Sequence, residues 1–427
     1  MSSALSVPEG YKMTEVGVIP RDWEVTTAIQ ICELVVDCKN RTPPVIEGGD
    51  YAVVRTPNVR NGNFVWEDLR FTDVLSFREW TARATPQAGD ILITREAPLG
   101  EVCLVPLDIP VCLGQRMMLY RPDPTKVSSS FLLYALMSPG VQGNLLKKIG
   151  GSTVGHAKVD DIRYLQVPLP SVITEQQAIA EALSDADALV ESLEQLLVKK
   201  RQIKQGAMQE LLTGQKRLLG FSGEWELKRL GDIAEMSSGG TPPSSNPDYY
   251  DGSVPWVSIA DMTKGGKYID STEKNLSSLG FENCAAQMFA VGTILYAMYA
   301  SLGECSIANV ALSSSQAILG IRSKSNLNNE FLYYFLESIK SQVKGMGQQG
   351  TQANLNKGMV QDFRLRLPLL PEQTAIATIL STLDSDIAAL QSQLVKARQI
   401  KQGMAQELLT GRIRLVSPAT PHQGVPA

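Results

Sequence analysis

One stretch of this chain occurs twice, almost unchanged. Residues 201–214 read RQIKQGAMQELLTG, and residues 398–411 read RQIKQGMAQELLTG, 197 positions later. When residues 198–218 are aligned with 395–415, 16 of 21 positions are identical and no gap is needed. A chain of 427 residues that repeats one unit in this way is expected to fold as two similar halves rather than around a single core.

The similarity continues upstream of the repeat, although it becomes weaker. At the same offset, Glu175 and Gln176 align with Glu372 and Gln373. Shorter matches follow in the same order: GDIL with GTIL, FLLY with FLYY, and WEV with WEL. The chain is therefore a direct tandem repeat whose order is globular part, helix, globular part, helix.

Each predicted helix carries one line of apolar residues spaced by alternating steps of four and three. This spacing is typical of the buried seam of a coiled coil. The residues of the first line are Ile179, Leu183, Ala186, Val190, Leu193 and Leu197, and those of the second are Ile376, Leu380, Leu383, Ile387, Leu390 and Leu394. Because similar units usually pack around a two-fold axis, the two helices are expected to bury their seams against each other in antiparallel directions.

The ends of both helices carry recognisable signals. Thr174 with Gln177 predicts a capping box at the first start, Pro371 marks the second start, and Gly214 and Gly411 are placed to end the helices. We therefore expect spacer helices at 174–214 and 371–411. About 39 helical residues would span ~58 Å at the ~1.5 Å rise of an α-helix.

The apolar rhythm is expected to break at RQIKQG. Continuing it from Leu197 would place Lys200 in the seam, whereas the apolar residue is Ile203. Gly206 and Gly403 follow, and a glycine inside a helix costs about 1 kcal/mol relative to alanine. These glycines allow close helix packing, or this basic stretch is a docking surface or a patch that faces DNA, and the two interpretations are compatible.

The two globular parts, 1–173 and 215–370, are predicted to mix α-helices and β-strands, so the predicted fold class is α+β. Residues 412–427 are expected to form a C-terminal tail. In the first part, strands are expected at 51–55, 90–94, 101–106 and 116–122, and helices at 130–138 and 141–149. The intervening loops differ between the halves and are rich in polar residues, which is common in loops of any function.

Catalytic motifs are missing from the sequence. There is no GxxxxGK[ST] loop, GxSxG elbow or HExxH pair, and the stretches TPPV and TPPS lack the flanking residues of a DNA aminomethyltransferase motif. The six cysteines form no CxxC pair, so we expect reduced, mostly buried thiols and no metal site. No run of 18 apolar residues occurs, and we expect a cytoplasmic protein. These patterns favour recognition or scaffolding over catalysis.

Several stretches together resemble the specificity (S) subunit of type I restriction–modification systems. They are GYKMTEVGVIPRDWEV at 10–25, TPP before a polar loop in both halves, LPLLPEQTAIATIL at 367–380, and the repeated RQIKQG–QELLTG pattern. The resemblance covers almost the whole chain, in the same order and twice.

The resemblance implies separate roles for the globular parts, the helices and the partner subunits. Each globular part would be a target-recognition domain for one half of a bipartite, asymmetric DNA site, and the helices would set the spacing and dock two methyltransferase (M) subunits. The M subunits would bring S-adenosylmethionine, and restriction (R) subunits would use ATP and magnesium. This chain alone would have no enzymatic activity and no cofactor. A net charge of −4 is compatible with this, because the partner subunits can neutralise the DNA phosphates.

Candidate DNA contacts are polar residues of the loops. In the first domain they are Arg55, Asn58, Arg60, Asn61, Gln115, Arg116, Lys147, Lys148, Thr153, His156 and Lys158. In the second they are Ser258, Asp261, Lys264, Tyr299, Gln316, Lys344, Gln348, Gln349, Thr351, Gln352, Asn354 and Lys357. Candidate partner-docking residues are Lys200, Arg201, Lys204, Gly206, Arg398, Lys401 and Gly403.

Two of these assignments can be stated more closely. Gln115 aligns with Gln316 and Asn58 with Asp261, which predicts comparable loop settings in the two halves. His156 is interpreted as a polar contact residue rather than a general base. Two other functions stay open: the recognition subunit of a type II-like methyltransferase–nuclease system, and a coiled-coil scaffold that does not bind DNA.

Overall fold

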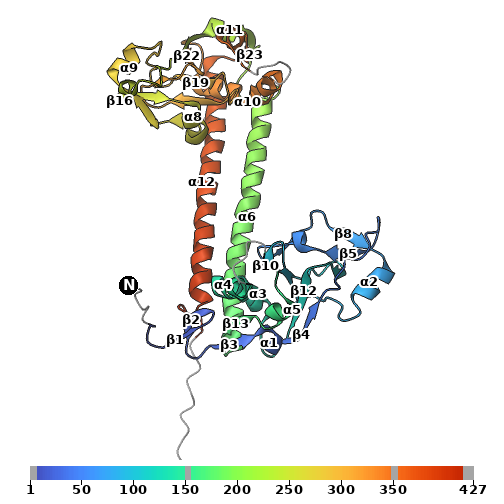
Figure 1. The fold of residues 1–427 in the computed structure, drawn as a ribbon. Coiled ribbons are helices and arrows are strands. Elements are labelled where there is room, and N and C mark those ends of the chain that lie inside the picture. Colours follow the sequence, from blue (N-terminus) through green and yellow to red (C-terminus); the bar gives the residue numbers. More distant parts are fainter. Residues whose placement is uncertain (1–6, 150–154, 348–353, 417–427) are drawn as a thin grey trace, which may run out of the picture. The chain divides into compact units, whose positions relative to one another are not determined.

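The structure is a computed structural model that describes residues 7–149, 155–347 and 354–416 (Figure 1). The chain divides into two compact units. Unit 1 comprises residues 1–193 and 393–427, and unit 2 comprises residues 194–392. Each of the two long helices contributes one part to each unit.

Unit 1 contains two main sheets. The first has the strand order β10 (Leu99–Leu104), β9 (Ile91–Arg95), β12 (Met117–Pro122), β4 (Cys32–Asp37), with antiparallel neighbours. The second has the order β11 (Val111–Leu113), β5 (Tyr51–Val54), β8 (Arg70–Thr72), in which β11 and β5 are parallel. These strands are short apolar runs whose side chains fill the unit's two apolar clusters, which explains why the sequence pattern located them.

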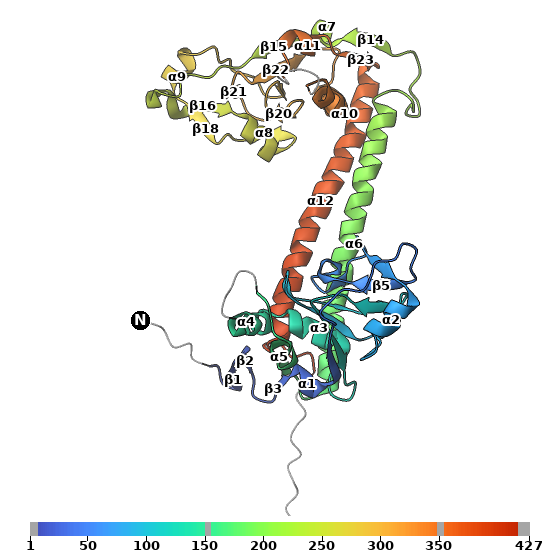
Figure 2. The ribbon, with the colours of Figure 1, turned by 45° about the vertical axis from the view of Figure 1, so that its right-hand side comes forward.

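Smaller elements surround these sheets. They are the strands β1 (Tyr11–Thr14), β2 (Gly17–Pro20), β3 (Glu24–Thr27), β6 (Val59–Arg60), β7 (Asn63–Phe64) and β13 (Gln166–Leu169), and the helices α1 (Ala28–Ile31), η1 (Thr56–Asn58), α2 (Val74–Trp80), α3 (Ser129–Met137), α4 (Pro139–Lys148) and α5 (Val159–Arg163). Figure 2 shows α3, α4 and α5 of this unit from a second side. The strands and helices predicted for the first globular part are confirmed.

Unit 2 repeats this arrangement. Its main sheet has the order β15 (Ala234–Ser238), β22 (Ile318–Ser323), β19 (Ile294–Ala297), β20 (Cys305–Ala308), β17 (Tyr268–Ile269), and the second sheet has the order β18 (Lys274–Leu276), β16 (Tyr250–Val257), β21 (Ser313–Ser314). The remaining elements are β14 (Glu226–Arg229), β23 (Arg364–Leu367), α7 (Leu230–Ile233), η2 (Pro247–Tyr249), α8 (Ile259–Gly265), α9 (Ser278–Glu282), α10 (Asn329–Gly347) and α11 (Lys357–Gln361). The order β4, β12, β9, β10 of unit 1 recurs as β15, β22, β19, β20 in unit 2, which adds β17 at the edge, and this shared order confirms the tandem repeat.

The long helices are α6 (Ile173–Leu211) and α12 (Leu370–Leu408), each of 39 residues. The predicted capping box is wrong: α6 begins one residue before Thr174, and the Val172 carbonyl accepts the first helical hydrogen bonds. Gly214 and Gly411 have φ values of +74° and +67°, the left-handed conformation expected of glycines that follow a helix.

Within each unit, the helix segments run antiparallel and are joined by ion pairs. In unit 2, Lys200 Nζ lies 2.8 Å from Asp386, and Lys204 pairs with Asp384, so rising numbers on α6 meet falling numbers on α12. In unit 1, Lys401 pairs with Asp187, the equivalent of the Lys204–Asp384 pair.

The predicted break in the seam is therefore wrong. The four-three rhythm continues from Leu197 through Lys200, Lys204 and Ala207 to Leu211, whereas Ile203 is 46% exposed. The lysines occupy seam positions because their aliphatic stems can lie along the helix pair while their ammonium groups reach aspartates on the other helix.

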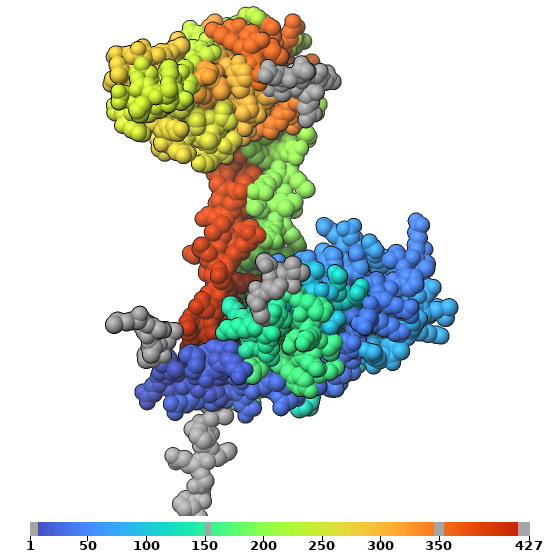
Figure 3. Space-filling view, viewed as in Figure 1, coloured from blue at the N-terminus to red at the C-terminus, as the bar shows by residue number. Residues whose placement is uncertain are grey.

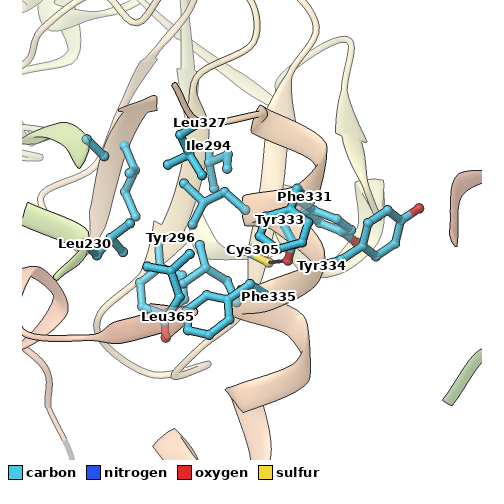
Figure 4. Close-up of a cluster of buried hydrophobic side chains, with 14 of the residues drawn as sticks. Leu230, Ile294, Tyr296, Cys305, Leu327, Phe331, Tyr333, Tyr334, Phe335 and Leu365 are labelled. Carbon is cyan, nitrogen blue, oxygen red and sulfur yellow. Dashed lines mark hydrogen bonds between the residues drawn. The ribbon is translucent and has the colours of Figure 1, made fainter. Parts of the chain in front are cut away.

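The globular cores are continuous with the helices of their own unit. In unit 2, Ile376 and Leu380 of α12 are buried in the same cluster as Phe331 of α10 and Tyr296 of β19. Figure 4 shows part of this cluster, with the aromatic side chains of α10 gathered beside the sheet. A fully buried aliphatic side chain contributes about 1.5–3 kcal/mol, so this shared core fixes the sheet of unit 2 to its helix segment.

The Glu-Gln pairs found by sequence comparison begin the helices with buried polar contacts. Gln176 accepts a hydrogen bond from the Ser128 N–H at 2.9 Å and donates to the carbonyls of Lys126 and Pro170. Gln373 makes the same three contacts in unit 2, with Asn328, Asn326 and Pro368. Each glutamine thus ties its helix to the loop that precedes α3 or α10.

The preceding glutamate holds an arginine that follows the other helix. Glu372 accepts two hydrogen bonds from Arg217, at 2.6 and 2.8 Å, and Arg414 pairs with both Glu175 and Asp22. The Arg414 contacts make the first residues of the predicted tail part of unit 1.

The beginning of the described chain lies beside the same end of α12. The Tyr11 hydroxyl donates to the Gly411 carbonyl at 3.1 Å, and a Cβ at Gly411 would collide with Pro20. Figure 3 shows these N-terminal residues, in dark blue, against the red end of α12. In the part of the chain that the structure describes, no helix is long and apolar enough to cross a membrane.

Candidate functional site

Three loops of unit 1 converge where β9 ends. They are the turn between β9 and β10, the loop before β12, and the segment before α5. The Arg95 N–H donates to the Arg116 carbonyl at 2.8 Å, and the Ala157 N–H donates to the Arg95 carbonyl at 2.9 Å. These backbone bonds bring Arg116 and His156, two of the predicted DNA contacts, to the same place.

Glu96 joins these two side chains. Its Oε1 lies 2.6 Å from Arg116 Nε, and its Oε2 lies 3.0 Å from His156 Nδ1. The side chains of Arg116 and His156 are about half exposed, at 46% and 55%, whereas that of Glu96 is 20% exposed. We call Glu96, Arg116 and His156 the Glu96 triad of the first domain.

The loop before β12 is further held by the first domain's TPP segment. The Gln115 N–H donates to Thr42 Oγ1 at 3.2 Å, and Arg116 has a φ of +76°, an uncommon conformation for a residue other than glycine. Gln115 directly precedes Arg116, and Lys158 lies two positions after His156. Both side chains are exposed. The loops thus present a polar surface on a backbone fixed by hydrogen bonds.

Unit 2 has the same backbone arrangement with different side chains. The Met298 N–H donates to the Ala317 carbonyl at 2.9 Å, and the Leu355 N–H donates to the Met298 carbonyl at 3.0 Å. These bonds gather the loops that carry three predicted contacts, Tyr299, Gln316 and Asn354. All three side chains are exposed.

Three predicted contacts instead have internal roles, and these predictions are corrected. Asn58 is fully buried, accepts the Arg55 N–H, and donates to the carbonyls of Val65 and Glu67. Ser258 and Asp261 cap the start of α8 by bonding each other's backbone and side-chain groups. Asn58 and Asp261 do occupy comparable settings, since each sits in the third position of a capped turn.

Asp261 is held as a carboxylate. Burial opposes its ionisation, but hydrogen bonds from Ser258 and from the Glu273 N–H lower its pKa below the ordinary value. Its two oxygens are occupied by these donors, so it serves the loop of α8 rather than an external ligand.

The other predicted contacts of segment 55–61 also have partners. Arg55 donates to the Asp68 carbonyl at 2.8 Å, and Arg60 donates to the carbonyls of Thr56 and Val59. The Asn61 N–H donates to Glu101 on β10, which leaves its exposed side chain beside the same hairpin as the triad.

The predicted lysine contacts are exposed and lie at element ends or on helix surfaces. Lys147 and Lys148 end α4, Lys158 precedes α5, Lys344 is on α10 and Lys357 begins α11, while Lys264 on α8 pairs with Glu273 at 3.2 Å. Thr153, Gln348, Gln349, Thr351 and Gln352 lie outside the described residues.

The predicted docking residues divide into two groups. Lys200, Lys204 and Lys401 pair with aspartates of the facing helix segment, which gives them a role within the helix pair, and their assignment to a docking surface stays a prediction. Arg201 and Arg398 have exposed side chains. Gly206 and Gly403 face open space, because a Cβ at either would meet no atom within 4 Å. Close packing within this chain therefore does not explain the two glycines.

Sequence reasoning missed Glu96 and Thr42. The repeat carried a signal for Glu96, because it aligns with Tyr299, which was selected in the other half. Thr42 was noted only as part of the TPP stretch, and its contact with Gln115 spans 73 positions in the sequence.

The site offers no metal centre. Over residues 7–149, 155–347 and 354–416, no group of three or more His, Cys, Asp and Glu side chains is arranged to hold a metal ion. All six cysteines lie within these ranges as free thiols, and five of them are buried. Burial raises the pKa of Cys103 and Cys112 to about 12, so these thiols are protonated at neutral pH.

Comparison with known proteins gives consistent results. A family model described as "Type I restriction modification DNA specificity domain" matches the chain twice, over residues 20–202 and 222–397. Two proteins of Methanocaldococcus jannaschii, named for the MjaX and MjaIX type I restriction enzyme specificity subunits, are 27% and 24% identical to it. Each alignment covers 95% of this chain, and 97% and 96% of the relatives.

Solved structures share the fold. The type I restriction–modification S subunit from M. genitalium aligns with a TM-score of 0.58 at 17% identity, over 96% of this chain and 99% of its own. A chain from a study of complex assembly in a type I R-M system aligns with a TM-score of 0.57 at 19% identity, over 92% and 99%. Because the family model covers both globular parts and much of each long helix, this chain belongs to the type I restriction–modification DNA specificity family.

Proposed function

We propose that the chain is the sequence-recognition subunit of a type I restriction–modification complex. Residues 1–173 and 215–370 are its two target-recognition domains, and each reads one half of a bipartite DNA site. The observation that carries this proposal is the pair of loop clusters around Arg95 and Met298, which share their backbone hydrogen bonds but differ in side chains. Such a pair suits two related surfaces that read different sequences.

Specificity subunits of type I systems are not catalytic, so the chemistry belongs to partner subunits. We assign S-adenosylmethionine to methyltransferase subunits, and ATP with magnesium to restriction subunits. The net charge of −4 fits this arrangement, because partners that surround the DNA supply the neutralisation of its phosphates.

The long helices carry two equivalent sets of exposed apolar residues. Val198 and Ile203 on α6 are 52% and 46% exposed, and their equivalents Val395 and Ile400 on α12 are 54% and 51% exposed. Each pair precedes a glycine whose missing side chain leaves open space. Two copies of one set of exposed residues, at the same places in both repeats, suit two copies of one partner. We assign these sets of residues to contacts with the two methyltransferase subunits.

The decisive test replaces one domain. Residues 22–170 are exchanged for those of another family member, and methylated sites are mapped across the genome in cells with either chain. We expect one half of the bipartite motif to change while the other half stays the same. An unchanged motif would refute recognition by this chain and favour the scaffold function. The subunits that co-purify with the chain separate a type I complex from a type II-like one.

A further inference from the structure

The Glu96 triad of the first domain holds one arginine in a defined position. In the part of the chain that the structure describes, Glu96 is the one charged partner of the Arg116 side chain, and it contacts the Nε side of the guanidinium. Over residues 7–149, 155–347 and 354–416, no hydrogen bond of the two terminal nitrogens is found, so they are left for a ligand. A guanidinium fixed on one side and half exposed presents these nitrogens as a planar fork.

The charge around this fork disfavours phosphate as its ligand. The carboxylate of Glu96 lies within 3.0 Å of both Arg116 and His156, so it offsets positive charge at this point of the surface. A phosphate would approach a carboxylate of the same sign, whereas the edge of a base carries no net charge. Guanine presents two acceptors, O6 and N7, in the major groove, and an arginine fork matches both.

The second domain lacks this arrangement at the equivalent place. Tyr299 replaces Glu96, Ala317 replaces Arg116, and Asn354 occupies the place of His156. No charged side chain stands at these three positions, although the backbone bonds are the same. The fork is therefore a property of the first half-site and not a feature that supports the fold of both domains.

We propose that Arg116 reads a guanine in the half-site contacted by the first domain, and that Glu96 is the residue that positions it. This inference rests on the proposed function and adds to it the kind of base that one side chain recognises. Arg116 is the specificity-determining residue, and Glu96 acts through it.

The test maps methylated sites made by the complete methyltransferase complex carrying full-length variants of this chain. Arg116→Ala is expected to relax one guanine position of the first half-site, with a loss of discrimination there of roughly tenfold or more. Arg116→Lys keeps the charge and much of the length. Lysine can also donate to guanine O6 and N7 but lacks the planar fork, so we expect a smaller relaxation at the same position than in Arg116→Ala. Full discrimination in Arg116→Ala, with a uniform fall in methylation, would indicate a phosphate contact and overturn the proposal.

Glu96→Gln tests the positioning residue. We expect relaxation at the same guanine position as in Arg116→Lys. A uniform fall in methylation with an unchanged motif would show that Glu96 only supports the loop, and would overturn its assignment. Arg78→Ala removes an exposed positive charge from α2 of the same domain and is the matched control, with no expected change in the motif.

Two results separate this inference from the proposed function. A first half-site that contains only A·T pairs in the wild-type motif would overturn the role of Arg116 while leaving recognition by the chain intact. A motif that fails to change when residues 22–170 are replaced would overturn the proposed function itself.

Discussion

At the start of each long helix, a buried carboxylate holds an arginine that is far away in the sequence. The Glu372 side chain is 3% exposed and accepts two hydrogen bonds from Arg217, whose side chain is 28% exposed. Trp225 donates to the same carboxylate at 3.2 Å. Removing one partner of such a pair leaves a buried charge without compensation, which is costly.

We expect Arg217→Ala to lower the free energy of unfolding of unit 2 by about 2 kcal/mol, less than for a fully buried pair because Arg217 is partly exposed. Urea unfolding followed by tryptophan fluorescence would measure the change. The matched control is Lys264→Ala, which removes an exposed ion pair with Glu273 and should cost under ~1 kcal/mol. Equal costs for the two variants would contradict the assignment.

A second residue-level prediction concerns acid. Hydrogen bonds from Arg414 hold the pKa of Asp22 below its ordinary value of 3.8. The folded state therefore binds fewer protons than the unfolded state around that pH. The stabilisation from Asp22 is present above about pH 4 and is lost as the pH falls through the lower, folded-state pKa.

Asp22→Asn is accordingly expected to be less stable than the natural chain at pH 6 and to approach it in stability as the pH falls below 4. Urea midpoints measured between pH 3 and 6 would show the two curves converging. A constant difference across this range would mean that the Asp22 carboxylate contributes no pH-dependent stability.

Polar loop residues show where sequence reasoning stops at this scale. Arg116 and Asn58 both occupy polar loops, yet one is half exposed and the other is fully buried with three backbone partners. Composition cannot separate these outcomes, because turns need internal hydrogen bonds from the same residue types that bind ligands. Aligning the two halves helped to locate loop residues only at positions where both halves have an equivalent.

At the scale of elements, the strands and helices were predictable because their apolar periods are strong. The seam through Lys200 and Lys204 was not, because a lysine there is tolerated only when an aspartate faces it from the other helix. That partner is 186 residues away for Lys200, so no local pattern reveals it. Ile203 was wrongly taken as a seam residue for the same reason, because its apolar side chain in fact lies outside the helix pair.

Gly206 gives a prediction in which stability and assembly change in opposite directions. Apart from the backbone of its own helix, no atom of the described residues lies within 4 Å of an added Cβ, so Gly206→Ala should raise the free energy of unfolding by about 0.5–1 kcal/mol. If the surface beside Ile203 docks a methyltransferase subunit, the same change should weaken co-purification of that subunit.

The matched control for this prediction is Gly143→Ala. Gly143 lies in α4, and a Cβ there also meets nothing within 4 Å, so it should stabilise the chain without affecting assembly. Unimpaired assembly in Gly206→Ala would remove this glycine from the docking surface. Gly403→Ala tests the second copy in the same way.

At the scale of the whole molecule, both long helices pass from one compact unit into the other. Each has 39 residues, which correspond to ~58 Å, more than the ~34 Å between sites one DNA turn apart. We propose that the helices set the gap between the half-sites. This role follows from the proposed function and from the family resemblance, and it can be tested by changing the helix length.

One heptad inserted after Leu193 in α6 and another after Ser392 in α12 keeps the seam rhythm and adds ~10 Å to each helix. We expect the methylated motif to keep both half-sites and to gain about three base pairs between them. Genome-wide mapping of methylation measures the gap directly. An unchanged gap would contradict the proposal that the length of the helices sets the spacing between the half-sites.

Unit 1 is assembled from two stretches that are far apart in the sequence, whereas unit 2 is one continuous stretch. On the ribosome, residues 194–392 are all available before the last third of α12 has been synthesised. Leu408 belongs to the apolar cluster that contains Ile179 and Leu183, and Arg414 pairs with Glu175, so these parts of unit 1 are complete only after the end of α12 has emerged. Synthesis therefore supplies all of unit 2 before it supplies the last part of unit 1.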